Sequence, residues 1–225
     1  MVRQARSEVT RRKIIDAAVD LFTDSGYGTT GLGDIIDRVG VTKGALYYHF
    51  DSKESLARAI IADGGAALGD AFAGISSTPA PALENMIHGV FVVASLVRTD
   101  KLAATAVHLS RALGEFTEAA AGAYGLWVQT LAAQAIQAQQ QGDVRDDVDT
   151  AAIAEVILAA LLGVELMSHA ASGGTDLIPR LTRAWEVLLP TIATDQALPY
   201  FREYLGRESM RHLAPAITVD EPAGR

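Results

Sequence analysis

The fold is decided between residues 34 and 50, which read DIIDRVGVTKGALYYHF. Ile35, Ile36 and Val39 place apolar side chains at helical spacing, and Gly40 can end that helix because glycine tolerates a left-handed backbone. After one further residue, the hydroxyl of Thr42 can cap a second, very short helix that ends near His49. Two short helices joined by a tight glycine turn predict a helix-turn-helix.

Helical periodicity continues ahead of this stretch. From Ile14, apolar residues recur at spacings of three and four, which predicts a helix that Gly26 ends. Thr29 and Thr30 are expected to cap the next helix, with Asp34 in its first turn, where the helix dipole favours an acid.

The remainder of the chain also has helical patterns. Asp51 and Ser52 can cap a fourth helix, which either ends at Gly64-Gly65 or continues to residue 72 or 75, before a linker at residues 76–81. Further helices are expected at residues 82–98, 101–113, 117–141, 149–171 and 176–193, with an amphipathic candidate at Tyr200–Leu205. Without an alternating strand pattern, the sequence predicts an all-α protein.

The composition of the 225 residues supports this fold class. Hydrophobic residues make up 49% and aromatic residues only 6%, which suits a helical core better than a β-sandwich or barrel. The absence of cysteine excludes disulfides, thiolate metal sites and cysteine nucleophiles, and a reducing cytoplasm is the expected location. No enzyme motif, cofactor motif or metal-ligand spacing is found, so we expect no catalytic residues, no cofactor and no metal.

Charge is distributed unevenly along the chain. The formal net charge is -8, but residues 1–60 carry nine Lys and Arg against eight Asp and Glu. Five of the basic residues lie within the first thirteen positions: Arg3, Arg6, Arg11, Arg12 and Lys13. A basic N-terminal arm before an acidic body is expected if only one end of the protein meets a polyanion, although a solvated N-terminus would have the same composition.

The short helix after Val41 has residue types unlike those of a core helix. Leu46 and Phe50, with Ala45, can anchor it to the neighbouring helices. The remaining positions carry donors or permit close approach: Thr42, Lys43, Gly44, Tyr47, Tyr48 and His49. Such donors at a helix start match the phosphate oxygens of duplex DNA, and Lys43 can donate to a guanine edge in the major groove. For Tyr48, packing against the first helix is the alternative.

The residues around this helix closely resemble the DNA-binding domain of TetR-family repressors. The resemblance covers about residues 9–60 and includes Gly26-Tyr27, Asp34-Ile35, the run from Val39 to Phe50 and Ser52-Lys53-Glu54. It implies that Thr42, Lys43 and Gly44 touch bases or phosphates and that Tyr47, His49 and Lys53 bind phosphates. Gly31 and Gly33 depart from the family pattern, so base reading is expected to rest more heavily on the third helix and on the N-terminal arm.

The resemblance divides the chain into a DNA-binding domain at residues 1–51, a helical ligand-binding and dimerisation domain at 52–214, and a mobile tail at 215–225. An apolar pocket is expected in the body, with Trp127 as its main wall and Phe91, Leu96, His108 and Tyr124 as further candidates, although ordinary core packing is the alternative for Trp127. Residues 98–104, 124–127 and 142–149 resemble the γ-butyrolactone receptor branch of the family, in which a tryptophan lies in the lactone pocket.

Residues 151–171 contain only two charges, Glu155 and Glu165. Their length permits a membrane span, but the two acids make one costly, so a buried soluble helix is the expectation and no membrane partner is expected. A homodimer is expected through the helices near 149–171 and 176–193, with Trp185 and Leu189 as a candidate stripe.

The resulting prediction is a dimeric repressor that binds a palindromic operator in double-stranded DNA and is released by an apolar or amphipathic small-molecule effector. Two alternatives remain open. One is a DNA-binding protein without small-molecule control, and the other is a helical enzyme that carries a DNA-binding domain.

Overall fold

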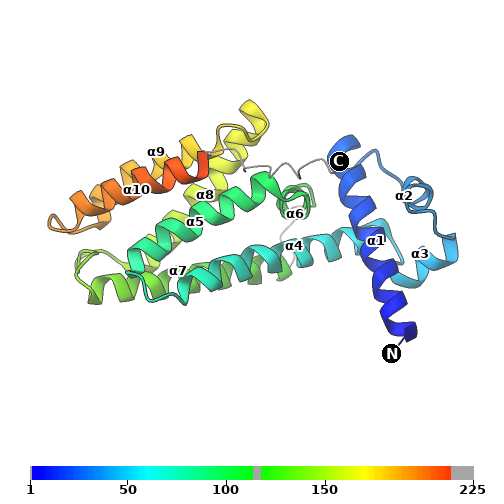
Figure 1. Ribbon diagram of the computed structural model, residues 1–225, viewed down its shortest axis with the longest axis horizontal. Helices are drawn as coiled ribbons and strands as arrows, with labels where there is room; N and C mark the ends of the chain where they lie inside the picture. The colour runs from blue at the N-terminus through cyan, green and yellow to red at the C-terminus, as the bar shows by residue number, and fades with distance from the viewer. Residues whose placement is uncertain (1, 114–117, 214–225) are drawn as a thin grey trace, which may run out of the picture. The chain divides into compact units, whose positions relative to one another are not determined.

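The computed structural model describes residues 2–113 and 118–213, with side chains described from 6 to 113 and from 124 to 213. In these ranges the chain is helical, and the one β-type pairing is an isolated bridge between Val144 and Ala193, so the expected all-α class is confirmed (Figure 1). The helices are α1 (Val2–Ser25), α2 (Leu32–Val39), α3 (Lys43–His49), α4 (Lys53–Ser76), α5 (Ala82–Thr99), α6 (Lys101–Ala112), α7 (Glu118–Gln140), α8 (Thr150–Ser172), α9 (Leu177–Ile192) and α10 (Leu198–Leu213). The tail predicted at 215–225 lies outside the described residues.

The helices form two compact units. Residues up to 71 and from 96 to 125 form the first, and residues 72–95 together with those from 126 onward form the second. The first unit therefore contains α1, α2, α3 and α6 and most of α4. Domain boundaries after residues 51 and 214 remain predictions.

The first unit has a single hydrophobic core to which each of its complete helices contributes. Ile14 and Ile15 of α1, Ile35 of α2, Leu46 of α3 and Leu56 of α4 are fully buried. Ala106 and Leu109 of α6 belong to the same core. The helical spacing of apolar residues in the sequence therefore predicted the buried faces of α1 to α3 correctly.

The start of α2 differs from the expectation. Gly31, in an extended conformation, is the N-cap, and its N–H donates to the Asp34 carboxylate at 2.7 Å. Thr30 is buried instead, and its hydroxyl donates to the Gly26 carbonyl at 3.0 Å, so the prediction that Thr29 or Thr30 caps α2 was wrong. Gly26 has φ +86°, which confirms that it ends α1 in the left-handed region.

The long helix α4 passes through Gly64 and Gly65 without a break. A Cβ at Gly64 would lie 2.4 Å from Ala106 Cβ and 2.9 Å from the Leu102 carbonyl oxygen, both on α6. A Cβ at Gly65 would meet nothing within 4 Å. Gly64 therefore allows α4 and α6 to approach more closely than any other residue would permit.

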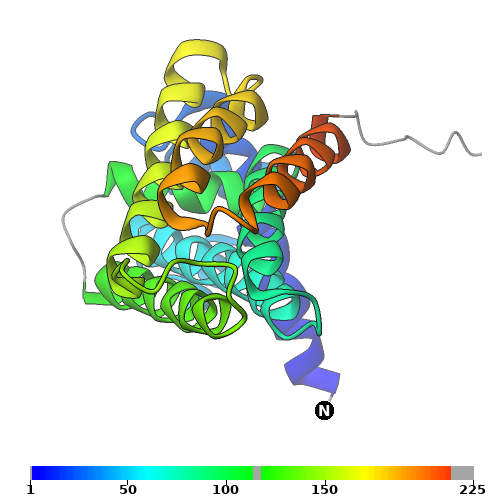
Figure 2. The ribbon, with the colours of Figure 1, turned by 90° about the vertical axis from the view of Figure 1, so that its left-hand side faces the viewer.

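In the second unit, α9 packs against both α8 and α10, as the view in Figure 2 shows from the end of these helices. Trp185 and Leu189 on α9 are buried within the unit, at 1% and 0% exposure. They are unavailable to a second subunit, so the expectation that they form a stripe at a dimer interface was wrong. Phe201 and Leu205 form the buried face of α10, and Tyr200 at its edge is exposed.

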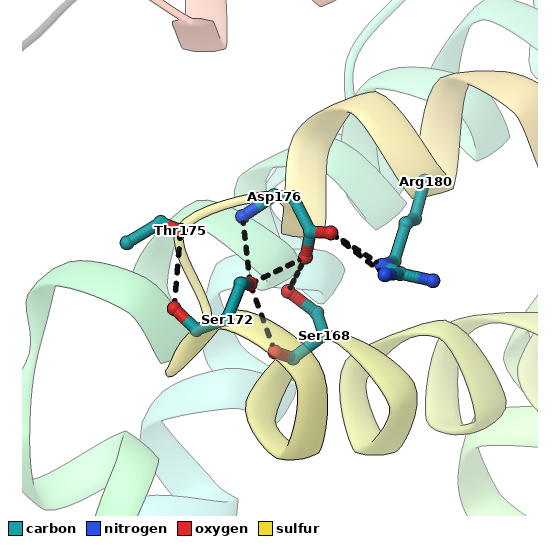
Figure 3. Close-up of polar contacts among 5 residues, drawn as sticks. All are labelled: Ser168, Ser172, Thr175, Asp176 and Arg180. Carbon is teal, nitrogen blue, oxygen red and sulfur yellow. Dashed lines mark hydrogen bonds and ion pairs between the residues drawn. The ribbon is translucent and has the colours of Figure 1, made fainter.

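The connection from α8 to α9 is fixed by hydrogen bonds around one carboxylate (Figure 3). Asp176 accepts hydrogen bonds from the hydroxyls of Ser168 and Ser172, both at 2.6 Å, and from Arg180 Nε at 2.8 Å. The two serine hydrogen bonds, helped by Arg180, lower the pKa of Asp176 to about 2. The carboxylate is therefore ionised at neutral pH and holds the ends of the two helices together.

Candidate functional site

The turn between α2 and α3 has the geometry expected of a helix-turn-helix. Gly40 has φ +71°, and its N–H donates to the Ile36 carbonyl at 2.9 Å, which closes α2. Two residues later Thr42 is the N-cap of α3, and its hydroxyl accepts from the Ala45 N–H at 3.1 Å. The cap leaves α3 a defined start and confirms the prediction for Thr42 as a capping residue.

The α3 helix has one buried face and one exposed face. Leu46 is fully buried and Phe50 is 5% exposed, so these two side chains anchor the helix, as predicted. Thr42, Lys43 and Gly44 are exposed at its start. A Cβ at Gly44 would meet nothing within 4 Å, so a ligand can approach the backbone closely at this position.

The aromatic residues of α3 point away from the core. Tyr47 is 44% exposed and Tyr48 is 78% exposed, so the alternative that Tyr48 packs against α1 was wrong. Lys43 Nζ lies 5.7 Å from the centre of the Tyr47 ring, and His49, half-buried, contacts the edge of Tyr48. An ammonium, two phenol hydroxyls and an imidazole thus lie together on the surface of one short helix.

Lys53 has a structural role that sequence reasoning did not anticipate. Its ammonium donates to the carbonyls of Tyr27 at 2.8 Å and Thr30 at 2.9 Å, and it lies 4.3 Å from the centre of the Tyr27 ring. The side chain therefore ties the loop before α2 to the start of α4. A phosphate contact from Lys53 remains a prediction, and it would have to use the third ammonium proton.

The basic N-terminal segment is part of α1, which begins at Val2. Arg11 pairs with Asp63 of α4 at 3.4 Å, and Arg12 pairs with Asp16 at 3.1 Å. These ion pairs neutralise part of the positive charge that the number of basic residues predicted for a DNA-binding arm.

The five predicted ligand-binding residues are distributed over both units. In the second unit, Phe91 is fully buried and Trp127 is half-buried, with its ring 5.3 Å from that of Phe72. Leu96, His108 and Tyr124 belong to the first unit. Leu96 and His108 are half-buried and Tyr124 is 40% exposed. A common pocket for the five remains a prediction.

His108 and Arg111 form a partly buried basic pair on α6. Burial, and then the neighbouring charge of Arg111, lower the pKa of His108, which favours the neutral imidazole. A neutral imidazole can donate or accept a hydrogen bond, which suits a contact with a lactone or carbonyl oxygen.

A surface of exposed apolar side chains runs along α8 and α9, and we call it the α8–α9 surface. It contains Val156, Leu166, Met167 and Val187, which are 48%, 52%, 58% and 70% exposed. A hollow of about 190 Å³ lies beside Val156, with walls from Ile153, Leu188 and Ile192. Among the described residues, α8 is also the one helix with the length and hydropathy of a membrane span, and 33% of its most apolar window is buried.

Sequence comparisons identify both parts of the chain. Residues 14–60 match the family described as bacterial regulatory proteins, tetR family, and residues 101–184 match the tetracyclin repressor-like C-terminal domain. The A-factor receptor protein of Streptomyces griseus is 33% identical over 193 residues, which are 86% of this chain and 67% of that protein.

Solved structures agree over nearly the whole chain. A crystal structure of a γ-butyrolactone receptor, described as an ArpA-like protein, has 26% identity and a TM-score of 0.76, and the match covers 92% of this chain and 99% of that one. CprB of Streptomyces coelicolor, solved in complex with its operator sequence, has 26% identity and a TM-score of 0.74 over the same shares. Together with the capped, exposed α3 helix, these matches show that the chain belongs to the TetR family of DNA-binding transcriptional regulators.

Proposed function

We propose that this protein is a cytoplasmic homodimeric repressor that binds a palindromic operator through α3 and is released by an amphipathic small molecule of the γ-butyrolactone type. The observation that carries the DNA-binding part is the division of α3 into a buried anchor, Leu46 with Phe50, and an exposed face of donors. In this arrangement Lys43 contacts a base edge, and Thr42, Tyr47 and His49 contact phosphates.

The dimer is proposed to form through the α8–α9 surface. Its four apolar side chains are 48% to 70% exposed, and several exposed apolar side chains on neighbouring helices are typical of protein interfaces. Burial against a second copy also explains why α8 has the hydropathy of a membrane span. A twofold dimer would present two α3 helices to half-sites about 34 Å apart, one turn of DNA.

The first unit suggests how a ligand signal reaches α3. On α6, Thr105 Oγ1 lies 3.1 Å from Thr23 Oγ1 of α1, and Lys101 Nζ donates to Asp20 of α1 at 2.6 Å. The adjacent face of α6, with Leu102 and Ala106, packs directly on Gly64 of α4. We therefore assign transmission to α6 together with α4.

The ligand class is proposed from the relatives. The structure of a γ-butyrolactone receptor is named for this ligand class, and the A-factor receptor protein is named for a small-molecule factor. Trp127 of the second unit can supply an apolar wall and an N–H donor for a small lactone with an alkyl chain, and the His108 imidazole of the first unit is a separate candidate contact. The coupling to DNA binding is expected to be about 1–3 kcal/mol, or 5- to 150-fold in affinity.

The experiment has two steps. Full-length protein selects its operator from random duplexes, and fluorescence anisotropy then measures binding of the selected duplex. Salt-dependent binding is expected, with release on addition of a γ-butyrolactone that carries an alkyl side chain. Selection of no sequence would reject the proposal. Binding that no lactone in a panel weakens would reject ligand control and favour a DNA-binding protein without an effector.

A further inference from the structure

Three side chains with metal-ligating groups meet between α5 and α10 in the second unit. His88 lies on α5, and Glu208 and His212 lie on α10, 120 and 124 positions further along the chain. One ligand atom from each lies within 4.8 Å of the others. Neither the DNA-binding face nor the proposed effector residues include this group, which we call the His–Glu–His cluster.

The distances within the cluster are close to those between the ligands of one metal ion. His88 Nδ1 lies 2.7 Å from Glu208 Oε2, and His212 Nε2 lies 3.5 Å from the same oxygen. In a tetrahedral zinc site, with metal–ligand bonds of about 2.0–2.1 Å, neighbouring ligand atoms are about 3.3–3.4 Å apart. The His212–Glu208 separation is already close to this value, whereas the His88–Glu208 pair would have to open by about 0.6 Å for both atoms to bind one ion.

The fold holds the three groups in this orientation. Glu208 and His212 are four residues apart and therefore share one face of α10. Arg211 Nη1 donates to Glu208 Oε1 at 2.5 Å, which leaves Oε2 directed at the two imidazoles. The ring of Phe91, fully buried, lies 5.8 Å from that of His212 and restricts its rotation.

The burial of the cluster also fits a metal site with an open position. The Glu208 side chain is 1% exposed, His212 is 12% exposed and His88 is 29% exposed. The cluster is therefore buried at its carboxylate and reaches solvent at His88, which provides an entry path and room for a water as a fourth ligand.

We propose that His88 Nδ1, His212 Nε2 and Glu208 Oε2 bind a divalent transition-metal ion, with zinc as the ion that fits best. Two imidazoles and one carboxylate suit zinc and its neighbours in the first transition row, whereas calcium and magnesium prefer oxygen ligands alone. A bound ion would join α10 to α5 and stabilise the second unit, because the unfolded chain does not keep the three ligands together.

The test uses untagged full-length protein that has been freed of metal with a chelator. Isothermal titration calorimetry with zinc chloride is expected to show binding to the His–Glu–His cluster, while magnesium chloride gives no heat of binding. Zinc is also expected to raise the melting temperature. Glu208→Gln and His88→Gln should each weaken zinc binding by at least about 10- to 100-fold. Glu203→Gln, on the exposed side of the same helix, is the matched control and should bind as the wild type does.

The proposal is overturned if the wild type binds no zinc, or if both glutamine variants bind it as tightly as the wild type. Circular dichroism establishes whether each variant is folded. If Glu208→Gln fails to fold because its side chain is buried, His88→Gln decides, since its side chain lies at the solvent edge. Unchanged zinc affinity in a folded His88→Gln variant would then show that the cluster is only an ion-pair network.

Discussion

Replacing Gly64 with alanine tests the close packing of α4 on α6. The new Cβ would lie 2.4 Å from Ala106 Cβ, and two carbon atoms in van der Waals contact are about 3.5–4.0 Å apart. The helices must therefore separate by about 1 Å or more, and overpacking of this kind costs about 1–3 kcal/mol. Alanine also gains about 0.5–1 kcal/mol over glycine within a helix, which offsets part of the loss.

Gly65→Ala is the matched control, because a Cβ there meets nothing within 4 Å and only the helix-propensity gain applies. Urea denaturation followed by circular dichroism should place Gly64→Ala about 1–3 kcal/mol below Gly65→Ala in free energy of unfolding. Operator affinity should change for Gly64→Ala alone, since α6 also contacts α1. Equal stabilisation by the two substitutions would refute the reasoning about α4 and α6.

Three further perturbations have defined outcomes. Thr42→Ala should lower the free energy of unfolding by about 1 kcal/mol in urea denaturation, because α3 loses its cap, and Thr42→Ser should restore it; equal stability of all three proteins would contradict the cap. Asp176→Asn should lower the melting temperature at pH 7. Because the pKa of Asp176 in the folded protein, about 2, is below the ordinary 3.8, the difference in melting temperature between wild type and variant should disappear as the pH falls from about 4 to 2. A difference that does not change with pH would contradict a stabilising role of the ionised carboxylate. Val187→Glu, on the exposed α8–α9 surface, should give a folded monomer in size-exclusion chromatography, whereas Val9→Glu on α1 should remain dimeric; a dimeric Val187→Glu would place the interface elsewhere.

Features set by neighbouring residues could be predicted from the sequence. The cap of α3 by Thr42 and its anchoring by Leu46 and Phe50 follow from helical spacing and capping chemistry, which act within a few residues. The resemblance to the TetR family rests on the same local run, and the comparisons confirm it.

Features that depend on distant packing could not be predicted. Gly31 is the N-cap of α2 because the Thr30 hydroxyl is buried and donates to the Gly26 carbonyl. This hydrogen bond forms only in the folded loop. The close approach of α6 at Gly64 and the burial of Trp185 by helices of its own subunit arise only when helices distant in sequence pack together.

The His–Glu–His cluster illustrates the same limit most clearly. Spacing along the chain gave no metal-ligand pattern, because 120 residues separate His88 from Glu208. Only the packing of α5 and α10 brings the two together.

The most direct test of the account measures how tightly the full-length protein binds its selected operator when Lys43 is replaced by alanine. Loss of one base-edge contact should weaken binding by about 1–3 kcal/mol, or 5- to 150-fold, and relax the sequence preference at one base pair. Arg207→Ala removes the same charge from α10, in the second unit, and should bind like the wild type at the same salt concentration. Unchanged affinity and sequence preference in folded Lys43→Ala would contradict the assignment of α3 as the helix that reads DNA.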